Sequence, residues 1–444
     1  MAEVVVIGGG LAGLAAAAAL GGAGHSVQLL ESRPFLGGRA TSYEIGNGEE
    51  VEFIDNCQHI LLRCCVNLID FYCRLGVEQD IAFSREFTFI EPGGRRSVLR
   101  RGLLPAPAHF LESFLQLSFL DFGEKLALAR AIRAIGRERN RADLDRISMQ
   151  QWLLEKRQPA RVIERFWRQV LVSAINEELD RMAAAHGFQV FRLGFLARAD
   201  SYEMGVPAVP LGRLYSGDAW ARIGKVNIRL RAPVSRIEMG GGVARGVMAG
   251  DEQVRGDYYI SAVPFERIGA IAPELDLDLS AFEHSPITGI HLWFDRAVTS
   301  LPHATLLDRT IQWMFNKGMV SQHDGRYLQL VVSASRSLTG MPRADVIALA
   351  LKELAEFFPS VRDAKLEKAH VVKEIRATFS ATPGLEAQRP GNVTGIPNLF
   401  LAGDWTRSGW PATMEGAVRS GYLAAEAVTA AMGAPQQFVR PDIA

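Results

Sequence analysis

Four residues near the start of the chain have the types and the spacing needed to bind a dinucleotide. Gly8, Gly10 and Gly13 form a Gly-x-Gly-x-x-Gly pattern, and Glu31 ends the apolar run that follows it. In this pattern the first glycine permits a tight turn, the second lets a phosphate approach the backbone, and the third lets a helix pack closely on a strand. An acidic side chain after the second strand can accept hydrogen bonds from ribose hydroxyls. We therefore predict a site for a dinucleotide pyrophosphate.

These glycines need a strand before them and a helix after them, and the neighbouring sequence supplies both. Residues 4–7 form a short apolar run, a helical pattern follows Gly10, and 27–31 form a second apolar run. The unpaired N–H groups and the positive dipole end of such a helix face a bound anion. The chain is therefore expected to begin with a strand, a helix and a strand, followed by a glycine-rich loop.

Strands of similar character return in the middle and at the end of the chain. We expect them at 226–230, 234–238, 243–247, 258–263 and 398–404, and a helix follows at about 413–431. The segments between these nucleotide-type strands have a different character. They show helical patterns at 123–138, 148–170 and 343–358 and further strands at 287–294 and 326–333. This alternation predicts two interleaved domains rather than two consecutive ones.

Composition excludes several classes of protein. A chain of 444 residues exceeds one comfortable core, and its net charge of zero argues against a nucleic-acid partner, which needs a basic excess. No run of about 20 apolar residues is present to span a bilayer, and the first strand begins too early for a signal peptide. The four cysteines lack paired C-x-x-C spacing, so we expect reduced structural thiols, no metal site and a cytoplasmic location.

Three further stretches bear on which dinucleotide is bound. Arg33 and Arg39 flank a glycine pair directly after Glu31, and both arginines can meet phosphate or flavin oxygens. Asp404 follows a strand that ends in glycine, where an acid can bond a ribityl chain. Met414 lies at the start of the last helix, whose free N–H groups can stabilise negative charge on a flavin ring.

The glycine loop, the Gly-Gly-Arg loop and the terminal GDW…PATMEGAVRSG motif occur in this order over nearly the whole chain. Together they resemble the FAD-dependent superfamily of amine oxidases, protoporphyrinogen oxidase and bacterial phytoene desaturases. The resemblance implies an α/β fold, with a Rossmann-like FAD-binding domain of the glutathione-reductase and amine oxidase type interleaved with an α+β substrate domain. The FAD-binding domain would comprise 1–75, 215–275 and 385–444, and the substrate domain, with its helical cap, 76–214 and 276–384.

The same resemblance implies a set of cofactor-binding residues. Carried over position by position, the FAD contacts would be Gly8, Gly10, Leu11, Ala12, Gly13, Glu31, Arg33, Gly37, Gly38, Arg39, Val234, Gly403, Asp404 and Met414. Among them, Val234 matches a position whose backbone meets the adenine.

Three further stretches resemble one branch of this superfamily, the squalene-associated FAD-dependent enzymes of hopanoid biosynthesis. They are residues 53–62, 166–177 and 288–295. Members of that family are hydroxysqualene dehydroxylases, which reduce hydroxysqualene to squalene. Departure of a hydroxyl needs a proton donor, and Asp55 and His59 are the candidate catalytic residues. A carotenoid or phytoene-type desaturase and a flavin amine oxidase are the alternatives.

The inserted regions are rich in large apolar side chains, which favours a hydrocarbon-binding tunnel. They include Phe110, Phe114, Phe119, Trp167, Phe188, Phe191, Trp293, Trp313, Met314 and Phe315. Segment 95–120 combines arginines with a proline-broken apolar stretch, so it could lie on the inner face of the cell membrane or form a buried cap. Expected partners are an isoprenoid substrate, a reductase or NAD(P)H as electron donor, and enzymes that form presqualene diphosphate.

Overall fold

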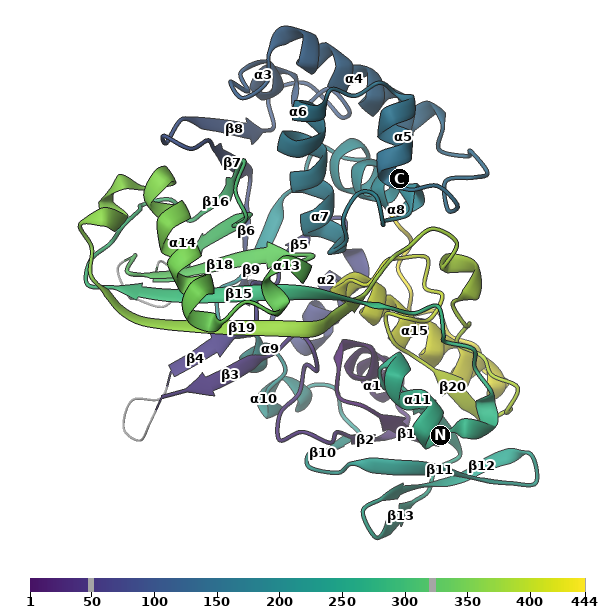
Figure 1. The fold of residues 1–444 in the computed structure, drawn as a ribbon. Helices are drawn as coiled ribbons and strands as arrows, with labels where there is room; N and C mark the ends of the chain where they lie inside the picture. The colour runs from purple at the N-terminus through teal and green to yellow at the C-terminus, as the bar shows by residue number, and fades with distance from the viewer. Residues whose placement is uncertain (47–51, 319–324, 444) are drawn as a thin grey trace.

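The structure, a computed structural model, describes residues 1–46, 52–318 and 325–443. At its centre is a five-stranded parallel sheet in the order β10-β2-β1-β14-β20. The strands are β1 (Glu3–Ile7), β2 (Ser26–Leu30), β10 (Val226–Arg229), β14 (Tyr258–Ser261) and β20 (Leu399–Leu401). The sheet thus joins the beginning, the middle and the end of the chain, as Figure 1 shows. The exact limits of the two domains stay a prediction.

Two buried helices pack against this sheet and against each other. They are α1 (Leu11–Gly22) and α15 (Met414–Ala431). Helix α1 is mostly alanine and leucine and is buried on all sides, so its small side chains allow close approach of its neighbours. A Cβ on Gly421 would lie only 2.1 Å from the carbonyl oxygen of Ala12, so α15 touches the α1 backbone directly.

A second, seven-stranded sheet lies beside the first in the order β19-β15-β18-β17-β16-β7-β8. Its strands are β7 (Glu86–Ile90), β8 (Arg96–Arg100), β15 (His284–Phe294), β16 (His303–Leu306), β17 (Trp313–Asn316), β18 (Tyr327–Ser333) and β19 (Leu366–Phe379). Alternate apolar side chains such as Ile290 and Leu292 pack beneath α14 (Arg343–Phe357). The opposite face, which carries His291 and Gln329, meets the stretch that follows the Gly-Gly-Arg loop.

A helical cap stands over one end of this sheet (Figure 1). It contains α3 (Leu111–Leu115), α4 (Phe122–Arg137), α5 (Met149–Glu155), α6 (Ala160–Val162), α7 (Gln169–Ile175) and α8 (Ala184–Gln189). The expected helical pattern over 148–170 is interrupted: α5 ends at Glu155, and Pro159 starts a new helix at α6. Two π-helical stretches, Ile163–Arg168 and Val190–Leu196, continue α6 and α8.

Small elements connect these parts. The remaining strands are β3 (Ser42–Ile45), β4 (Glu52–Asp55), β5 (Leu61–Leu62), β6 (Ile81–Ser84), β9 (Met204–Pro207), β11 (Val234–Gly240), β12 (Val243–Ala249) and β13 (Glu252–Val254). The remaining helices include α2 (Val66–Leu75), α9 (Leu211–Leu214), α10 (Gly217–Trp220), α11 (Phe265–Ile271) and α13 (Arg336–Thr339).

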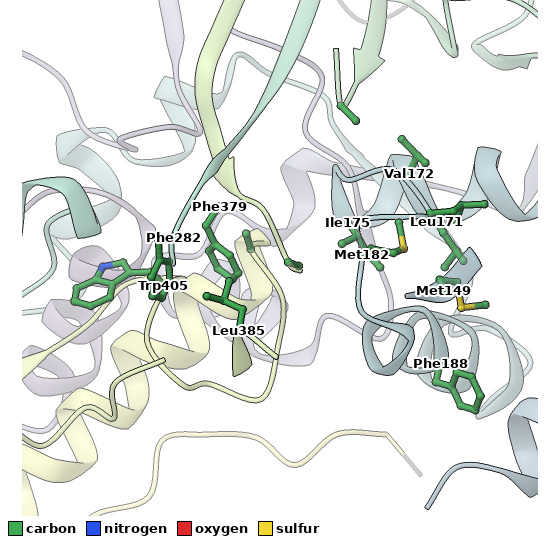
Figure 2. Packing of buried hydrophobic residues seen from close by; sticks show 14 of the residues in the cluster. Met149, Leu171, Val172, Ile175, Met182, Phe188, Phe282, Phe379, Leu385 and Trp405 are labelled. Atoms are coloured by element: carbon green, nitrogen blue, oxygen red, sulfur yellow. The ribbon is translucent and has the colours of Figure 1, made fainter. Parts of the chain in front are cut away.

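Aromatic packing joins the two sheets. Trp405, after β20, approaches Phe282 with ring centroids 6.5 Å apart, and Phe282 lies 5.8 Å from Phe379 at the end of β19. Figure 2 shows these rings on one side and the apolar residues of the cap, such as Met149 and Phe188, on the other. No helix among the described residues is long and apolar enough to cross a membrane.

Candidate FAD and substrate site

The glycine turn has the tight geometry that its sequence predicts. Gly8 has a φ of +108°, and a Cβ there would lie 2.8 Å from the carbonyl oxygen of Ala262. A Cβ on Gly13 would lie 2.0 Å from the carbonyl oxygen of Gly8. Only glycine fits at either position, so α1 begins directly against the end of β1.

The start of α1 has free backbone N–H groups that can bind an anion. Gly10 is its N-cap, no side chain among the described residues caps the helix, and its first turn contains no acidic residue. The N–H groups of Leu11, Ala12 and Gly13 therefore remain available for the oxygens of a pyrophosphate. A Cβ on Gly38 would come within 2.9 Å of Gly10 Cα, so the Gly-Gly-Arg loop also needs glycine where it meets the turn. The residues present thus fit a dinucleotide.

Glu31, which is predicted to contact the ribose, also holds the glycine turn in place. Its carboxylate accepts hydrogen bonds from the Gly9 N–H at 2.6 Å and from the Arg33 N–H at 2.7 Å. The backbone of residues 231–232 bonds to the carbonyls of Arg33 and Glu31, and β11 then begins at Val234. The structure therefore brings Val234 to the same end of the sheet as Glu31. Contact of either residue with the nucleotide stays a prediction.

Arg39 and Asp404 meet although hundreds of residues separate them in sequence. The Arg39 guanidinium forms an ion pair with the Asp404 carboxylate and also donates to the carbonyl of Ala377 in β19, at 3.1 Å. About a third of the Arg39 side chain remains exposed, so it can still bind an oxygen of a cofactor. This pair joins the Gly-Gly-Arg loop, which includes Gly37, to the end of the nucleotide-binding sheet.

The residues before α15 form the opposite wall of the site. Gly403 has a φ of +142°, and a Cβ there would lie 2.4 Å from Nε1 of Trp405. The Thr413 side chain caps α15 by accepting from the Gly416 N–H at 3.0 Å, so Met414 is the first helical residue. Met414 lines an apolar cavity that begins at this end of α15.

Sequence reasoning missed Glu415, the residue after Met414. Its buried carboxyl accepts hydrogen bonds from the backbone N–H groups of Asn67 and Leu68, at 3.1 and 2.7 Å, and from the Asn67 side chain at 2.8 Å. Burial raises its pKa to about 7, although these hydrogen bonds act in the opposite direction. Glu415 thereby fixes the start of α2 to the start of α15. Its only sequence signal is its place inside the terminal motif.

An apolar cavity of about 160 Å³ runs from the start of α15 to the second sheet. Its walls include Met414, Ile60, Phe87 and Trp313. Of the ten large side chains expected to line a tunnel, Trp313 does so. The expectation is wrong for Met314, which packs under α14, and for Trp167, Phe188 and Phe191, which pack inside the cap. Their helical spacing reflects core packing.

A polar pocket of about 540 Å³ lies on the other side of α7. Gln169 lines both this pocket and the apolar cavity, and it is only 5% exposed. Charged groups around the polar pocket are paired, as in the Arg168–Glu178 bridge at 2.5 Å. This pairing leaves the pocket poorly suited to a strongly charged ligand.

Asp55 is 2% exposed and receives three hydrogen bonds through its carboxylate. Ser42 Oγ and the Leu211 N–H donate to one oxygen at 2.8 and 3.0 Å, and Lys317 Nζ donates to the other at 3.1 Å. Lys317 also donates to the side-chain oxygen of Gln58 at 3.1 Å. Sequence reasoning did not find this lysine, because it reaches Asp55 only through the pairing of distant strands.

His59 lies in the same stretch but has a different character. Its Nδ1 lies 3.0 Å from the carbonyl oxygen of Cys57, which can only accept, so this nitrogen carries the proton. Burial lowers the pKa of the imidazole below its ordinary value, while the Cys57 carbonyl and Asp55 act in the other direction. A neutral ring in this tautomer presents Nε2 as an acceptor rather than as an acid.

The sequence is similar to those of known flavin-dependent enzymes. The model of the family described as flavin containing amine oxidoreductase matches residues 11–429. The chain is 29% identical to a probable zeta-carotene desaturase of Synechococcus elongatus, covering 96% of this chain and 98% of that protein. It is 26% identical to the 15-cis-phytoene desaturase of the same species, covering 96% of each.

Solved structures share the fold at low sequence identity. An oxidoreductase from Methanosarcina mazei superposes with a TM-score of 0.72 at 19% identity, over 94% of this chain and 98% of that one. Putrescine oxidase, bound to putrescine, superposes with a TM-score of 0.71 at 16% identity, over 97% and 99% of the two chains. These neighbours confirm the expected α/β fold. The match to a flavin-containing family confirms FAD as the expected cofactor. The chain belongs to the family of flavin-containing amine oxidoreductases.

Proposed function

We propose that this oxidoreductase removes the hydroxyl of hydroxysqualene by reduction, giving squalene. The main support for the substrate class is the apolar cavity beside Met414, which would hold a hydrocarbon close to the expected flavin position. Burial of apolar surface contributes about 25 cal/mol per Å², so a long isoprenoid would gain most of its affinity from such walls. The resemblance of residues 53–62, 166–177 and 288–295 to squalene-associated enzymes supports the substrate.

Two groups of residues would have different roles, one binding the cofactor and the other assisting departure of the hydroxyl. The start of α1 and the Gly-Gly-Arg loop would hold the pyrophosphate, and Arg39 and Asp404 would lie near the flavin side. Bound FAD, when reduced, supplies a hydride equivalent. Asp55 and His59 would form the polar end of the site, where Asp55 would orient a proton donor and His59 would accept a hydrogen bond.

A carotenoid desaturase is the second candidate. Relatives at 25–29% identity that cover 96% of this chain carry that description, and their hydrocarbon substrates would suit the same cavity. A desaturase moves hydride in the opposite direction, from substrate to oxidised flavin. An amine oxidase is a third candidate, although most of the residues that line the cavity are apolar.

Anaerobic incubation with two forms of the enzyme separates these functions. Prereduced holoenzyme mixed with hydroxysqualene should yield squalene, measured by mass spectrometry, together with flavin reoxidation. Bleaching of oxidised flavin by phytoene or zeta-carotene, without squalene formation from hydroxysqualene, would establish the desaturase instead. Peroxide release from polyamines would indicate an amine oxidase.

An exposed apolar patch on the cap supports peripheral contact with a membrane. We define the apolar patch as Leu103, Leu104, Leu111, Leu115, Phe122 and Leu126, and Leu103 and Phe122 are 95% and 77% exposed. Four leucines of segment 95–120 belong to this exposed patch, whereas Phe119 is buried and Phe110 and Phe114 pack on the core. The exposed leucines, rather than the phenylalanines of this segment, would therefore enter the lipid. A substrate dissolved in the inner face of the cell membrane could enter here.

Two classes of partner complete the proposal. A reductase or NAD(P)H would return electrons to the flavin, and enzymes that form presqualene diphosphate would act earlier in the same reaction sequence. Mixing oxidised holoenzyme with NADPH under anaerobic conditions tests direct reduction, because flavin bleaching would then need no added reductase.

A further inference from the structure

The apolar cavity beside Met414 has two buried polar atoms in its walls that lack a hydrogen-bond partner among the described residues. They are Gln169 Oε1 and Thr305 Oγ1, and both residues line the cavity. Gln169 is 5% exposed and Thr305 is 1% exposed. A buried polar atom without a partner costs free energy, so two of them in the walls of one cavity indicate a polar group on the ligand.

Thr305 lies within the aromatic wall that the second sheet contributes to the cavity. In β16 it pairs with Phe89 of β7 on one side and with Trp313 of β17 on the other. Paired residues have their side chains on the same face of a sheet, and both aromatic neighbours line the cavity as well. The Thr305 hydroxyl, which can donate and accept, is therefore set between two aromatic rings.

Gln169 lies on the helix that forms the next wall, α7, and Ser173 connects this helix to the sheet. Ser173 Oγ accepts a hydrogen bond from Trp313 Nε1 at 2.7 Å and donates to the carbonyl oxygen of Gln169, also at 2.7 Å. Trp313 thus neighbours Thr305 in the sheet and reaches the turn of α7 that begins at Gln169, so the two unpaired atoms belong to one region of the cavity. The last side-chain torsion of glutamine is soft, which allows the amide to turn toward a group bound there.

The chemistry of this pair favours an alcohol over a hydrocarbon. A hydrocarbon placed against both atoms would leave each of them without a partner, whereas one hydroxyl can donate to Gln169 Oε1 and accept from Thr305 Oγ1. A hydroxyl also suits either orientation of the amide, because it can donate or accept. Neither side chain is charged, so the pair fits a neutral oxygen.

We propose that Gln169 and Thr305 form a subsite that binds the hydroxyl of an isoprenoid alcohol. The hydroxyl donates to the amide oxygen of Gln169 and accepts from the hydroxyl of Thr305, while the apolar walls hold the hydrocarbon chain. Affinity then depends on an oxygen that squalene and the carotenoid hydrocarbons lack. This subsite rests on the proposed function and adds how the alcohol is recognised, not the proton that its oxygen takes on departure.

Two ligands that differ in one hydroxyl test the subsite without turnover. The Kd values of hydroxysqualene and squalene are measured with oxidised holoenzyme in the same detergent micelles, by perturbation of the flavin spectrum. Two hydrogen bonds should make the wild type prefer the alcohol by about ten- to a hundredfold. Thr305→Val keeps the shape of the side chain and should reduce the preference about three- to tenfold, and combination with Gln169→Met should abolish it.

Squalene binding separates a hydroxyl subsite from a structural role. In Thr305→Val and Gln169→Met the hydrocarbon no longer covers an unpaired polar atom, so squalene should bind at least as tightly as to the wild type. The thermal midpoint of the ligand-free holoenzyme should not fall, because each substitution removes an atom that has no partner. Weaker binding of both ligands together with a lower midpoint would show that these side chains serve packing and would reject the subsite.

Ser285→Ala is the matched control. The Ser285 hydroxyl is also buried and has no partner within the described part of the chain, but this residue does not line the cavity. The preference for the alcohol should therefore remain in this variant. Flavin content is checked in every variant.

The outcomes distinguish the subsite from the proposed function. Equal binding of the two ligands by the wild type, or an unchanged preference in the double variant, would overturn the subsite. Squalene formation from hydroxysqualene in either case would leave the function standing. A preference that is lost in the double variant, without squalene formation by the wild type, would support the subsite and reject the dehydroxylase.

Discussion

Gly421 lies where helix α15 touches the backbone of helix α1. Substitution at this position therefore permits a quantitative test of the expected pyrophosphate site. A methyl group there would lie 2.1 Å from the Ala12 carbonyl oxygen and 3.1 Å from Ala15 Cβ. Carbon and oxygen need a separation of about 3.3 Å, so Gly421→Ala should push α15 away from α1 by roughly 1 Å. The displaced carbonyl belongs to the first turn of α1, where the pyrophosphate is expected.

Two quantities should change together in Gly421→Ala. Overpacking of this size costs about 1–3 kcal/mol of unfolding free energy, which urea titration of the apoprotein measures. Displacement of the first turn should weaken its hydrogen bonds to the cofactor and raise the Kd of FAD at least about tenfold, measured by fluorescence titration.

Gly269→Ala in α11 is the matched control. A Cβ at Gly269 meets no atom within 4 Å, so the same substitution should stabilise the helix by about 0.5–1 kcal/mol and leave FAD binding unchanged. If Gly421→Ala unfolded at the wild-type urea concentration and bound FAD normally, direct contact between the helices would not hold the site together.

Three other variants test separate parts of the structure. Burial lowers the pKa of His291 from 6.5 to about 3, so the unfolded chain binds more protons between these values and stability should fall as pH falls. His291→Gln should remove about 1.4 kcal/mol per pH unit of that dependence, measured by urea titration from pH 6.5 to pH 4. The Asp121 side chain accepts from the Glu124 N–H at 2.9 Å, and Asp121→Ala should destabilise the cap by about 1 kcal/mol, seen in thermal unfolding. Leu103→Ser combined with Leu115→Ser leaves the charge unchanged and should reduce sedimentation with anionic vesicles at least about tenfold; unchanged sedimentation would reject the apolar patch as the membrane contact.

Local patterns in the sequence were sufficient for the nucleotide-binding part of the fold. The turn from Gly8 to Gly13 and the strand after it depend on neighbouring residues, so their spacing predicts their structure. The strand β19 was missed because it alternates charged and apolar residues at the edge of a sheet. Edge strands are only partly buried, so their pattern is weak.

The candidate site was harder to predict where it depends on pairing between distant strands. Asp55 could be chosen from its motif, but Lys317 reaches it only because β17 pairs with β18 and the sheet then meets the end of β4. No local spacing carries that information. The aromatic residues of the cap were wrongly expected to line a tunnel. Their helical spacing is equally compatible with packing in a core and with lining a tunnel, so spacing could not distinguish the two.

The five-stranded sheet combines strands that are far apart in the sequence, and this affects how the protein folds during synthesis. Strand β20 pairs with β14, and the sheet is complete only when residues 399–401 have left the ribosome. Pairings over such sequence separations form slowly, and incomplete chains expose unpaired strand edges. Nascent chains would therefore present this unpaired edge to chaperones until residues 399–401 have emerged, and FAD would be captured only after that point.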